Sequence, residues 1–174
     1  MKAPILETKR IILQPLTTAD AKEAFANWTS DDRVTKYMRY NSHQSVEDTT
    51  DWLKSVEEAS ESDKQYDWGF VDKATNQLFG SGGLVYNDKT QMFEIGYNIM
   101  FNRWHRGYTS EAVTAILEFA KNTLNQKKIY GRHAVENIYS GKVMEKNGFV
   151  PTGYDVITNF DGTTKEVRTY LVKF

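Results

Sequence analysis

The 174-residue chain contains no cysteine, few prolines, only three histidines and no long apolar run. Without cysteine it can form no disulfide, thiolate nucleophile or cysteine-ligated metal site. No two histidines stand at ligand spacing, so we expect no metal. No segment reaches the roughly 20 apolar residues of a membrane-spanning helix, and the N-terminus lacks the apolar core of a signal peptide. We therefore expect a cytoplasmic protein with no membrane partner.

Charge of one sign is also scarce. The chain has 22 Lys and Arg against 23 Asp and Glu, a net charge of −1, so its composition gives no reason to expect nucleic-acid binding. Hydrophobic residues make up 40% and charged residues 26%, which is typical of globular proteins. The length suits one domain with a substantial core. We expect a single domain over residues 1–174, acting as a monomer or a homodimer.

The hydrophobic pattern changes its period along the chain. Helical patterns run over 17–28, 30–38, 45–60, 109–124 and 137–149. Patterns of period two predict strands over 10–16, 66–72, 77–87, 92–101, 127–135, 149–158 and 165–174. Among these residues, Ser45 is a candidate N-cap, and Gly96 indicates a bulge or a close backbone approach. The mixed order predicts an α/β (α+β) domain with one central mixed sheet.

The sequence RWHRGYTSEAV, residues 103–113, places positive charge directly before a helix. A helix N-terminus already carries partial positive charge and unpaired N–H groups, so Arg103, His105 and Arg106 suit this place only if an anion binds there. Gly107 permits an unusual backbone angle and lets a phosphate approach the backbone. The alternative is a solvated basic turn with Thr109 or Ser110 as the helix cap. The spacing of a nucleotide-binding P-loop is absent.

The residues around this loop resemble those of a known family. EIGYNIMFNRWHRGYTSEA (94–112) is similar to the strand–loop–helix signature of the RimJ/RimL-like (ribosomal-protein N-acetyltransferase-like) branch of the GNAT superfamily, in which E-I-G-Y leads to W-[GH]-[KR]-G-Y-[AT]-[ST]-E-A. HAVENIYSGKVMEKNGF (133–149) resembles its second signature, E-N-x-x-S-x-x-x-x-E-K-x-G-F. LETKRIILQPLTTAD and DDRVTKYM match its N-terminal run. Against the superfamily's general motif, [Q/R]-x-x-G-x-[G/A], Trp104 and Thr109 depart from the pattern.

The resemblance implies both a fold and an activity. The fold is a GNAT-like three-layer arrangement with about four helices around a mixed, mostly antiparallel sheet of six to seven strands. The strands over 92–101 and 127–135 splay apart, and acyl-CoA lies in the gap. The activity is acetyl-CoA-dependent N-acetyl transfer without a metal, in which a primary amine attacks the thioester directly in a ternary complex. The amine belongs to a protein N-terminus or to a small molecule.

Two other functions stay open at this point. One is a CoA-binding module with little or no catalysis, which the atypical loop motif favours. The other is an unrelated phosphate-binding domain.

The resemblance also implies residues that hold CoA. Its pyrophosphate would bind the backbone N–H groups of His105, Arg106, Gly107, Tyr108, Thr109 and Ser110, and the Arg106 side chain can add charge-assisted hydrogen bonds. The pantetheine arm would pair like an added strand near Tyr97 to Ile99. Asn137 would contact the CoA arm, or it is a plain N-cap for the following helix.

Two residues are implied for the chemistry. Glu94 would act as the base or orient the amine, and its alternative is a strand-surface salt bridge. Many GNAT enzymes place a tyrosine at the position of Met144 to donate a proton to the leaving sulfur. Methionine has no proton to donate, so Ser140, one turn earlier, would hydrogen-bond the sulfur. The alternative for Ser140 is a hydroxyl that bonds back to a helix carbonyl.

The acceptor pocket is implied to lie between the final hairpin and the helices after the first strand. Candidate residues in the helical region are Trp28, Asp31, Arg33, Tyr37, Arg39 and His43. Charges of both signs occur among them, so the charge of the acceptor is not readable from the sequence.

Overall fold

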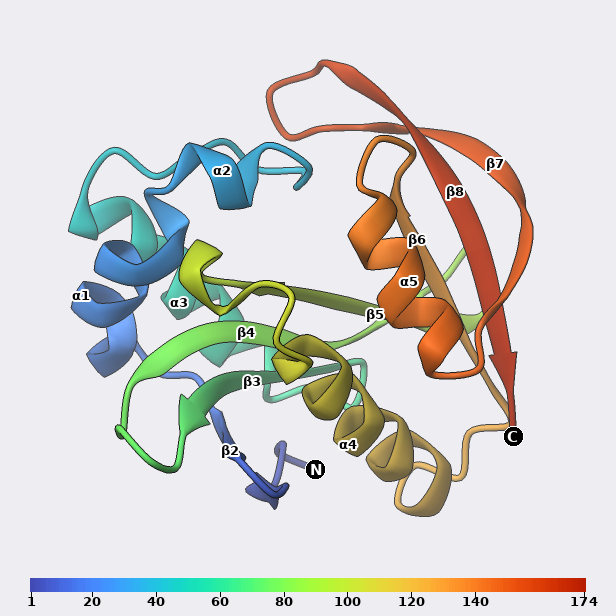
Figure 1. Ribbon diagram of the computed structural model, residues 1–174, viewed down its shortest axis with the longest axis horizontal. Coiled ribbons are helices and arrows are strands. Elements are labelled where there is room, and N and C mark those ends of the chain that lie inside the picture. The colour runs from blue at the N-terminus through green and yellow to red at the C-terminus, as the bar shows by residue number, and fades with distance from the viewer.

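An eight-stranded sheet runs through the computed structural model, which describes residues 1–174 (Figure 1). Its strands are β1 (Leu6–Glu7), β2 (Ile11–Pro15), β3 (Gln65–Asp72), β4 (Leu78–Asn87), β5 (Met92–Ile99), β6 (Lys128–Ala134), β7 (Val150–Thr158) and β8 (Thr164–Lys173). They lie in the order β1-β2-β3-β4-β5-β6-β8-β7, and every neighbouring pair is antiparallel except β5 and β6. The mixed, mostly antiparallel sheet is confirmed, with one strand more than expected.

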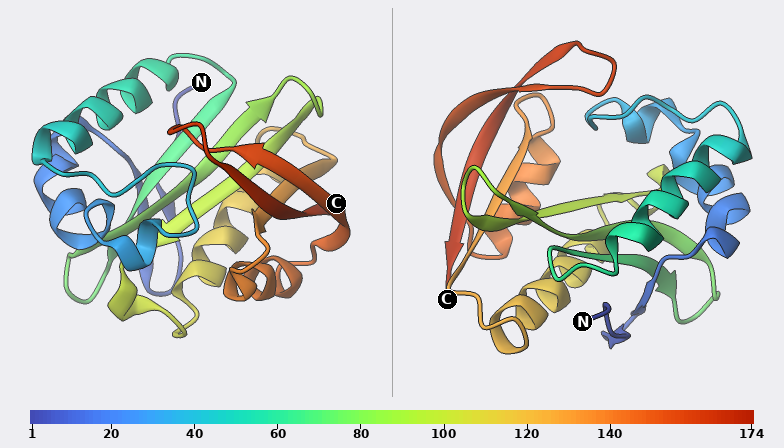
Figure 2. Two further views of the ribbon diagram at one scale, coloured as in Figure 1. Left: turned by 90° about the horizontal axis from the view of Figure 1, so that it is seen from above. Right: turned by 180° about the vertical axis from the view of Figure 1, so that it is seen from behind.

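Helices cover both faces of this sheet (Figures 1 and 2). The five α-helices are α1 (Ala21–Ala24), α2 (Asp32–Thr35), α3 (Val46–Ala59), α4 (Tyr108–Asn122) and α5 (Ile138–Lys146). Two hydrophobic clusters fill the space between helices and sheet. The two clusters lie on opposite faces of the sheet, because adjacent residues of a strand point to opposite faces. In β4, Phe79 packs with residues of α4, and Leu78 packs with residues of α1 and α3. The three-layer arrangement is therefore confirmed. None of the helices has the length and apolar character needed to cross a membrane.

The sheet opens between β5 and β6. These strands pair at only two positions, Glu94 with Tyr130 and Ile95 with Gly131, and then diverge. The expected splay is therefore confirmed, and it leaves the edge of β5 unpaired after Ile95. On its other side, β5 is fully paired with β4, and the Met100 N–H donates to the Phe79 carbonyl at 2.7 Å.

Hydrogen bonds alternate along an antiparallel strand. Counting back from Met100, the N–H groups of Ile99 and Tyr97 point away from β4 and toward the opening. The backbone at this edge is therefore available to pair with an extended ligand.

The structure corrects several details of the expected elements. The helix over 17–28 is divided into a 3₁₀ turn (Thr18–Asp20), α1 and a π-helical turn (Phe25–Thr29). Gly96 marks neither a bulge nor a close approach, because it pairs regularly with Gly83 and an added Cβ would meet nothing within 4 Å. Ser45 does cap α3, since its side chain accepts from the Asp48 N–H at 3.3 Å.

Candidate functional site

A cleft of ≈ 390 Å³ lies beside the open edge of β5, with the N-terminus of α4 and the side of α5 in its wall. All expected site residues except Glu94 and Arg106 line it. Glu94 lines a smaller cavity of ≈ 170 Å³. Five residues line both spaces, so the cleft and the cavity meet there: Tyr37, Met38, Tyr97, Asn137 and Ser140.

The loop before α4 presents a run of unpaired backbone donors. None of the six consecutive N–H groups from His105 to Ser110 donates to another group of the chain, and the first bonded N–H is that of Glu111, 3.1 Å from the Gly107 carbonyl. His105 and Gly107 have left-handed backbone angles, with φ of 60° and 78°. Such a loop at a helix N-terminus forms a concave site for a phosphate group. A solvated turn capped by Thr109 or Ser110 does not describe it, because no side chain caps α4.

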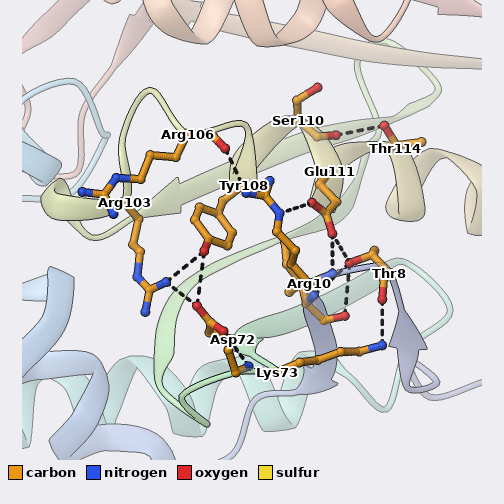
Figure 3. A network of polar contacts seen from close by, with 12 residues as sticks. Thr8, Arg10, Asp72, Lys73, Arg103, Arg106, Tyr108, Ser110, Glu111 and Thr114 are labelled. Carbon is orange, nitrogen blue, oxygen red and sulfur yellow. Dashed lines mark hydrogen bonds and ion pairs between the residues drawn. The ribbon is translucent and has the colours of Figure 1, made fainter.

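Glu111, in the first turn of α4, anchors this loop from behind (Figure 3). Its carboxylate accepts hydrogen bonds from the Thr8 hydroxyl at 2.6 Å, the Arg10 N–H at 2.8 Å and the Arg10 Nε at 2.7 Å. Burial alone would raise the pKa of Glu111, but these hydrogen bonds outweigh burial and lower it. Arg10 also donates from Nη1 to the Arg106 carbonyl at 3.1 Å. The carbonyl side of the loop is thus held by the protein, and its N–H groups are left available.

The two arginines of the loop do not add free positive charge to the cleft, which corrects the expectation for Arg103 and Arg106. Arg103 forms an ion pair with buried Asp72 and donates to the Tyr108 hydroxyl at 3.2 Å (Figure 3). It also donates to Gln77 at 2.8 Å. Its charge is therefore balanced inside the protein. The Arg106 side chain is exposed and does not line the cleft. The positive charges that α5 contributes to the cleft wall are Lys142 and Lys146.

Trp104 has a structural role that accounts for its place in the motif. Its indole Nε1 donates to the Ile99 carbonyl at 3.0 Å, one of the groups that point away from β4. The ring therefore ties the loop to the end of β5. The side chain supports the shape of this loop and leaves the N–H groups from His105 to Ser110 without a partner.

A pair of hydroxyl groups bridges β5 and α5 where the two spaces meet. The Tyr97 hydroxyl lies 3.0 Å from the Ser140 carbonyl and 3.0 Å from the Ser140 hydroxyl. Burial raises the pKa of Tyr97, so this hydroxyl stays protonated. Ser140 does not bond back to a helix carbonyl, so that alternative is wrong. Asn137 does cap α5, because it accepts from the Ser140 N–H at 3.3 Å, and it also lines the cleft.

Glu94 is fixed inside the smaller cavity. Its Oε1 lies 2.7 Å from Arg132 Nε on β6, and its Oε2 accepts from Asn87 at 3.2 Å. Both charged side chains of the pair are only 18% exposed. The salt bridge that was the alternative for Glu94 is therefore present, but it lies within the cavity wall. Sequence reasoning missed Arg132, which alternates with buried residues on its strand.

Few of the helical residues expected around the acceptor reach the cavity. Tyr37 and Arg39 line it, together with Met38. Trp28 is fully buried in the second hydrophobic cluster, and Asp31 and Arg33 form an ion pair with each other. No three His, Asp or Glu side chains lie together in a way that could hold a metal ion.

Comparison with known proteins identifies relatives along most of the chain. Residues 10–150 match the family model described as "Acetyltransferase (GNAT) domain". The uncharacterized N-acetyltransferase YoaA of Bacillus subtilis (strain 168) is 29% identical over 173 residues, which cover 97% of this chain and 96% of that protein.

Solved structures share the fold. The ribosomal-protein-S5-alanine acetyltransferase of Vibrio fischeri superposes with a TM-score of 0.81 at 18% identity, covering 98% of this chain and 96% of that one. The microcin C7 self-immunity acetyltransferase MccE, solved in complex with acetyl-CoA and AMP, gives a TM-score of 0.83 at 14% identity, covering 96% of this chain and 94% of that one. At these identities the likeness extends to the fold alone.

Proposed function

Because the chain belongs to the acetyltransferase (GNAT) family and is therefore an acyltransferase, we propose that it moves an acetyl group from acetyl-CoA to a primary amine. One observation carries this proposal. Six consecutive N–H groups without partners, from His105 to Ser110, stand beside an unpaired strand edge in the same cleft. A pyrophosphate joined to an extended arm has the shape and charge to use both features.

The residues present fit acetyl-CoA. The loop N–H groups would hold the pyrophosphate, with Lys142 and Lys146 as the nearby positive charges. The backbone of Tyr97 to Ile99 would pair with the pantetheine arm, and Asn137, which also lines the cleft, would contact that arm. MccE, which has the same fold, was solved in complex with acetyl-CoA and AMP.

When bound, acetyl-CoA would supply the acetyl group and a thiolate leaving group. The Tyr97 hydroxyl donates to one of the two oxygens of Ser140, and if it donates to the carbonyl, the Ser140 hydroxyl proton is available to the sulfur. We assign Ser140 to this role. The outward N–H groups of β5 would stabilise an oxyanion, since donors fixed in advance favour charge that develops during reaction.

Glu94 would orient the amine or take its proton. The ion pair with Arg132 holds the carboxylate in one place, in the cavity that adjoins the Tyr97–Ser140 pair. An α-amine has a pKa of ~7.7–8.0 and is partly neutral at pH 7, so it demands less of a base than a lysine does.

A CoA-binding module with little catalysis is the second candidate. It is favoured by the pairing of Glu94 with Arg132, which leaves no unpaired carboxylate in the cavity. Thiol release that depends on an added amine separates the two candidates. In either case we propose a cytoplasmic protein, which the absence of cysteine supports.

Thermal unfolding with acetyl-CoA, with ATP as the control anion, tests the proposal. A ligand at about 100 times its dissociation constant stabilises by roughly 2.7 kcal/mol, which raises the midpoint of a chain of this length by roughly 5–10 °C. We expect this rise with acetyl-CoA but not with ATP, followed by amine-dependent release of CoA thiol. Equal shifts with both ligands would indicate a general phosphate-binding site, and no shift with either would overturn the proposed function.

A further inference from the structure

The smaller cavity has an excess of positive charge. The lysine, arginine, aspartate and glutamate side chains that line it are Arg39, Glu94, Arg132 and Lys165. Glu94 and Arg132 neutralise each other at 2.7 Å. Arg39 and Lys165 form no ion pair. The cavity that adjoins the proposed reaction centre therefore carries two positive charges that no carboxylate of its lining balances.

Neutral carbonyl groups are the only hydrogen-bond acceptors of these two cations. Lys165 Nζ donates to the Met38 carbonyl at 2.6 Å, and two further N–H groups of this ammonium have no partner. Arg39 donates from Nε and Nη2 to the Thr158 carbonyl at 3.1 and 2.8 Å, and its Nη1 has no partner. Asp161, the acid that influences Lys165 most strongly, uses its carboxylate on Asn41 and Thr163. Both cations thus retain donors for a ligand.

The hydrogen bonds of Lys165 and Arg39 join two segments beside the cavity. We call these segments the clasp: residues 38–41 and the tip of the β7–β8 hairpin, residues 158–165. Besides the bonds of Lys165 and Arg39, the Phe160 N–H donates to the Arg39 carbonyl at 3.0 Å. Figure 2 shows the hairpin tip next to the segment that follows α2. The clasp joins two parts of the chain more than 115 residues apart.

The clasp and the cavity volume favour a small acceptor over a polypeptide. The volume of ≈ 170 Å³ is below the range of roughly 300–1,000 Å³ that holds drug-sized ligands. A protein N-terminus needs an open groove for the residues that follow the amine, and the clasp spans one side of this cavity.

We propose that the acceptor is a small primary amine that also carries a carboxylate or a phosphate, and that Lys165 and Arg39 bind this anionic group. The inference rests on the proposed function and specifies its substrate class. Glu94 would then bind the amine of the same molecule, so the cavity offers one negative and two positive groups to an acceptor of mixed charge. Charge-assisted hydrogen bonds of this kind are short and strong, which makes them suited to selecting a substrate.

The test compares amines that differ only in the anionic group. Acetyl transfer from acetyl-CoA is followed by thiol release with free amino acids and with their carboxamides, and with O-phosphoethanolamine and ethanolamine. We expect kcat/KM to be at least tenfold higher for the charged member of a pair. The two pairs distinguish a carboxylate from a phosphate as the preferred anion.

Two variants of Lys165 test whether this residue causes the preference for charged acceptors. Lys165→Gln keeps a donor for the Met38 carbonyl and removes the charge, so KM for charged acceptors should rise at least tenfold while KM for carboxamides stays the same. Lys165→Arg should restore most of the loss. Lys173→Gln, at the exposed end of the same strand, is the matched control and should change neither value.

Each outcome bears on one proposal. If carboxamides and amino acids react equally well, or a peptide amine reacts better than both, the anionic acceptor is overturned and N-acetyl transfer stands. If acetyl-CoA binds but no charged amine reacts, the anionic acceptor is overturned as well. If neither acetyl-CoA binding nor any amine-dependent thiol release is found, the proposed function itself fails.

Discussion

The hydroxyl oxygens of Tyr97 and Ser140 lie 3.0 Å apart and bridge the opening between β5 and α5. They join a strand edge to a helix at the place where the cleft meets the smaller cavity. A proton held here is shared by two side chains, and either hydroxyl can donate while the other accepts. In the proposed reaction, the pair would offer a hydrogen bond to the leaving sulfur without a tyrosine at the position of Met144.

Replacing Ser140 by alanine tests this role. We expect Ser140→Ala to lower kcat about 100-fold, toward the lower end of what a positioned proton donor contributes. Affinity for acetyl-CoA, measured by calorimetry, should stay the same because the loop over 105–110, which we propose binds the pyrophosphate, is untouched. Tyr97→Phe should cost less, since it leaves the Ser140 hydroxyl in place. An unchanged kcat in Ser140→Ala would mean that the sulfur takes its proton from another group.

Gly107 is the position where the loop tolerates a side chain least. Its φ of 78° is left-handed, which strains a non-glycine residue by roughly 1–2 kcal/mol, and an added Cβ would lie 3.4 Å from Arg10 Nη2. We expect Gly107→Val to abolish acetyl-CoA binding while the domain stays folded. Gly162→Val is the matched control, because Gly162 has a φ of 87° and open space around it in the β7–β8 turn. Unchanged affinity in Gly107→Val would mean that the pyrophosphate binds elsewhere.

Glu94 and Arg132 can be separated by paired substitutions. Glu94→Gln should lower turnover more than tenfold with acetyl-CoA binding kept, because the amine loses its anionic partner. Arg132→Gln breaks the same 2.7 Å ion pair but leaves the carboxylate in the cavity, so it should lose less. Turnover is measured from pH 6 to pH 9. Equal losses in the two variants would reduce Glu94 to a partner of Arg132, and unchanged turnover of Glu94→Gln at every pH would remove it from the mechanism.

Asp67 gives the fold a distinctive dependence on pH. Burial raises the pKa of Asp67 to about 6, and its one hydrogen-bond partner is Gln65 at 2.7 Å. The unfolded chain releases this proton near pH 3.9, so the folded state binds more protons between about pH 4 and pH 6. The stability that the protonated form contributes is therefore lost as pH rises through this window.

Asp67→Asn, which mimics the protonated form, should increase the free energy of unfolding at pH 7 by on the order of 2–3 kcal/mol and change it little below pH 4. Urea unfolding at a series of pH values measures this difference. Asp51→Asn is the control, because Asp51 is exposed on α3. A gain of equal size at pH 4 and pH 7 would show that ionisation of Asp67 is not its cause.

Most of the fold follows from local pattern. Each predicted strand and hairpin was found, since alternation and polar turns are properties of neighbouring residues. β1 was missed because two residues, Leu6 and Glu7, are too few to show a period. The helix over 17–28 was predicted as one element, but the chain must wrap Trp28 into the second cluster, and tertiary packing divides it.

The site likewise has one part that follows from local sequence and another that depends on the fold. The loop over 105–110 could be located because a contiguous motif encodes its backbone. The partner of Arg103 could not, since Asp72 lies 31 positions earlier and only the fold brings them together. The pairing of Glu94 with Arg132 and the clasp at Lys165 also depend on contacts between segments that lie far apart in the sequence. Sequence reasoning therefore located the loop whose N–H groups are unpaired and missed the charge of the cavity beside it.

The unpaired loop donors have a consequence for hydrogen exchange. In the protein without a cosubstrate, the six amides from His105 to Ser110 have no acceptor to protect them, although Glu111 and the rest of α4 begin a regular ladder directly after them. They should exchange with deuterium within seconds, next to a helix that exchanges slowly. A bound pyrophosphate would protect them together. This short segment is thus a built-in reporter of occupancy, which isotope exchange can read residue by residue without any label or assay of turnover.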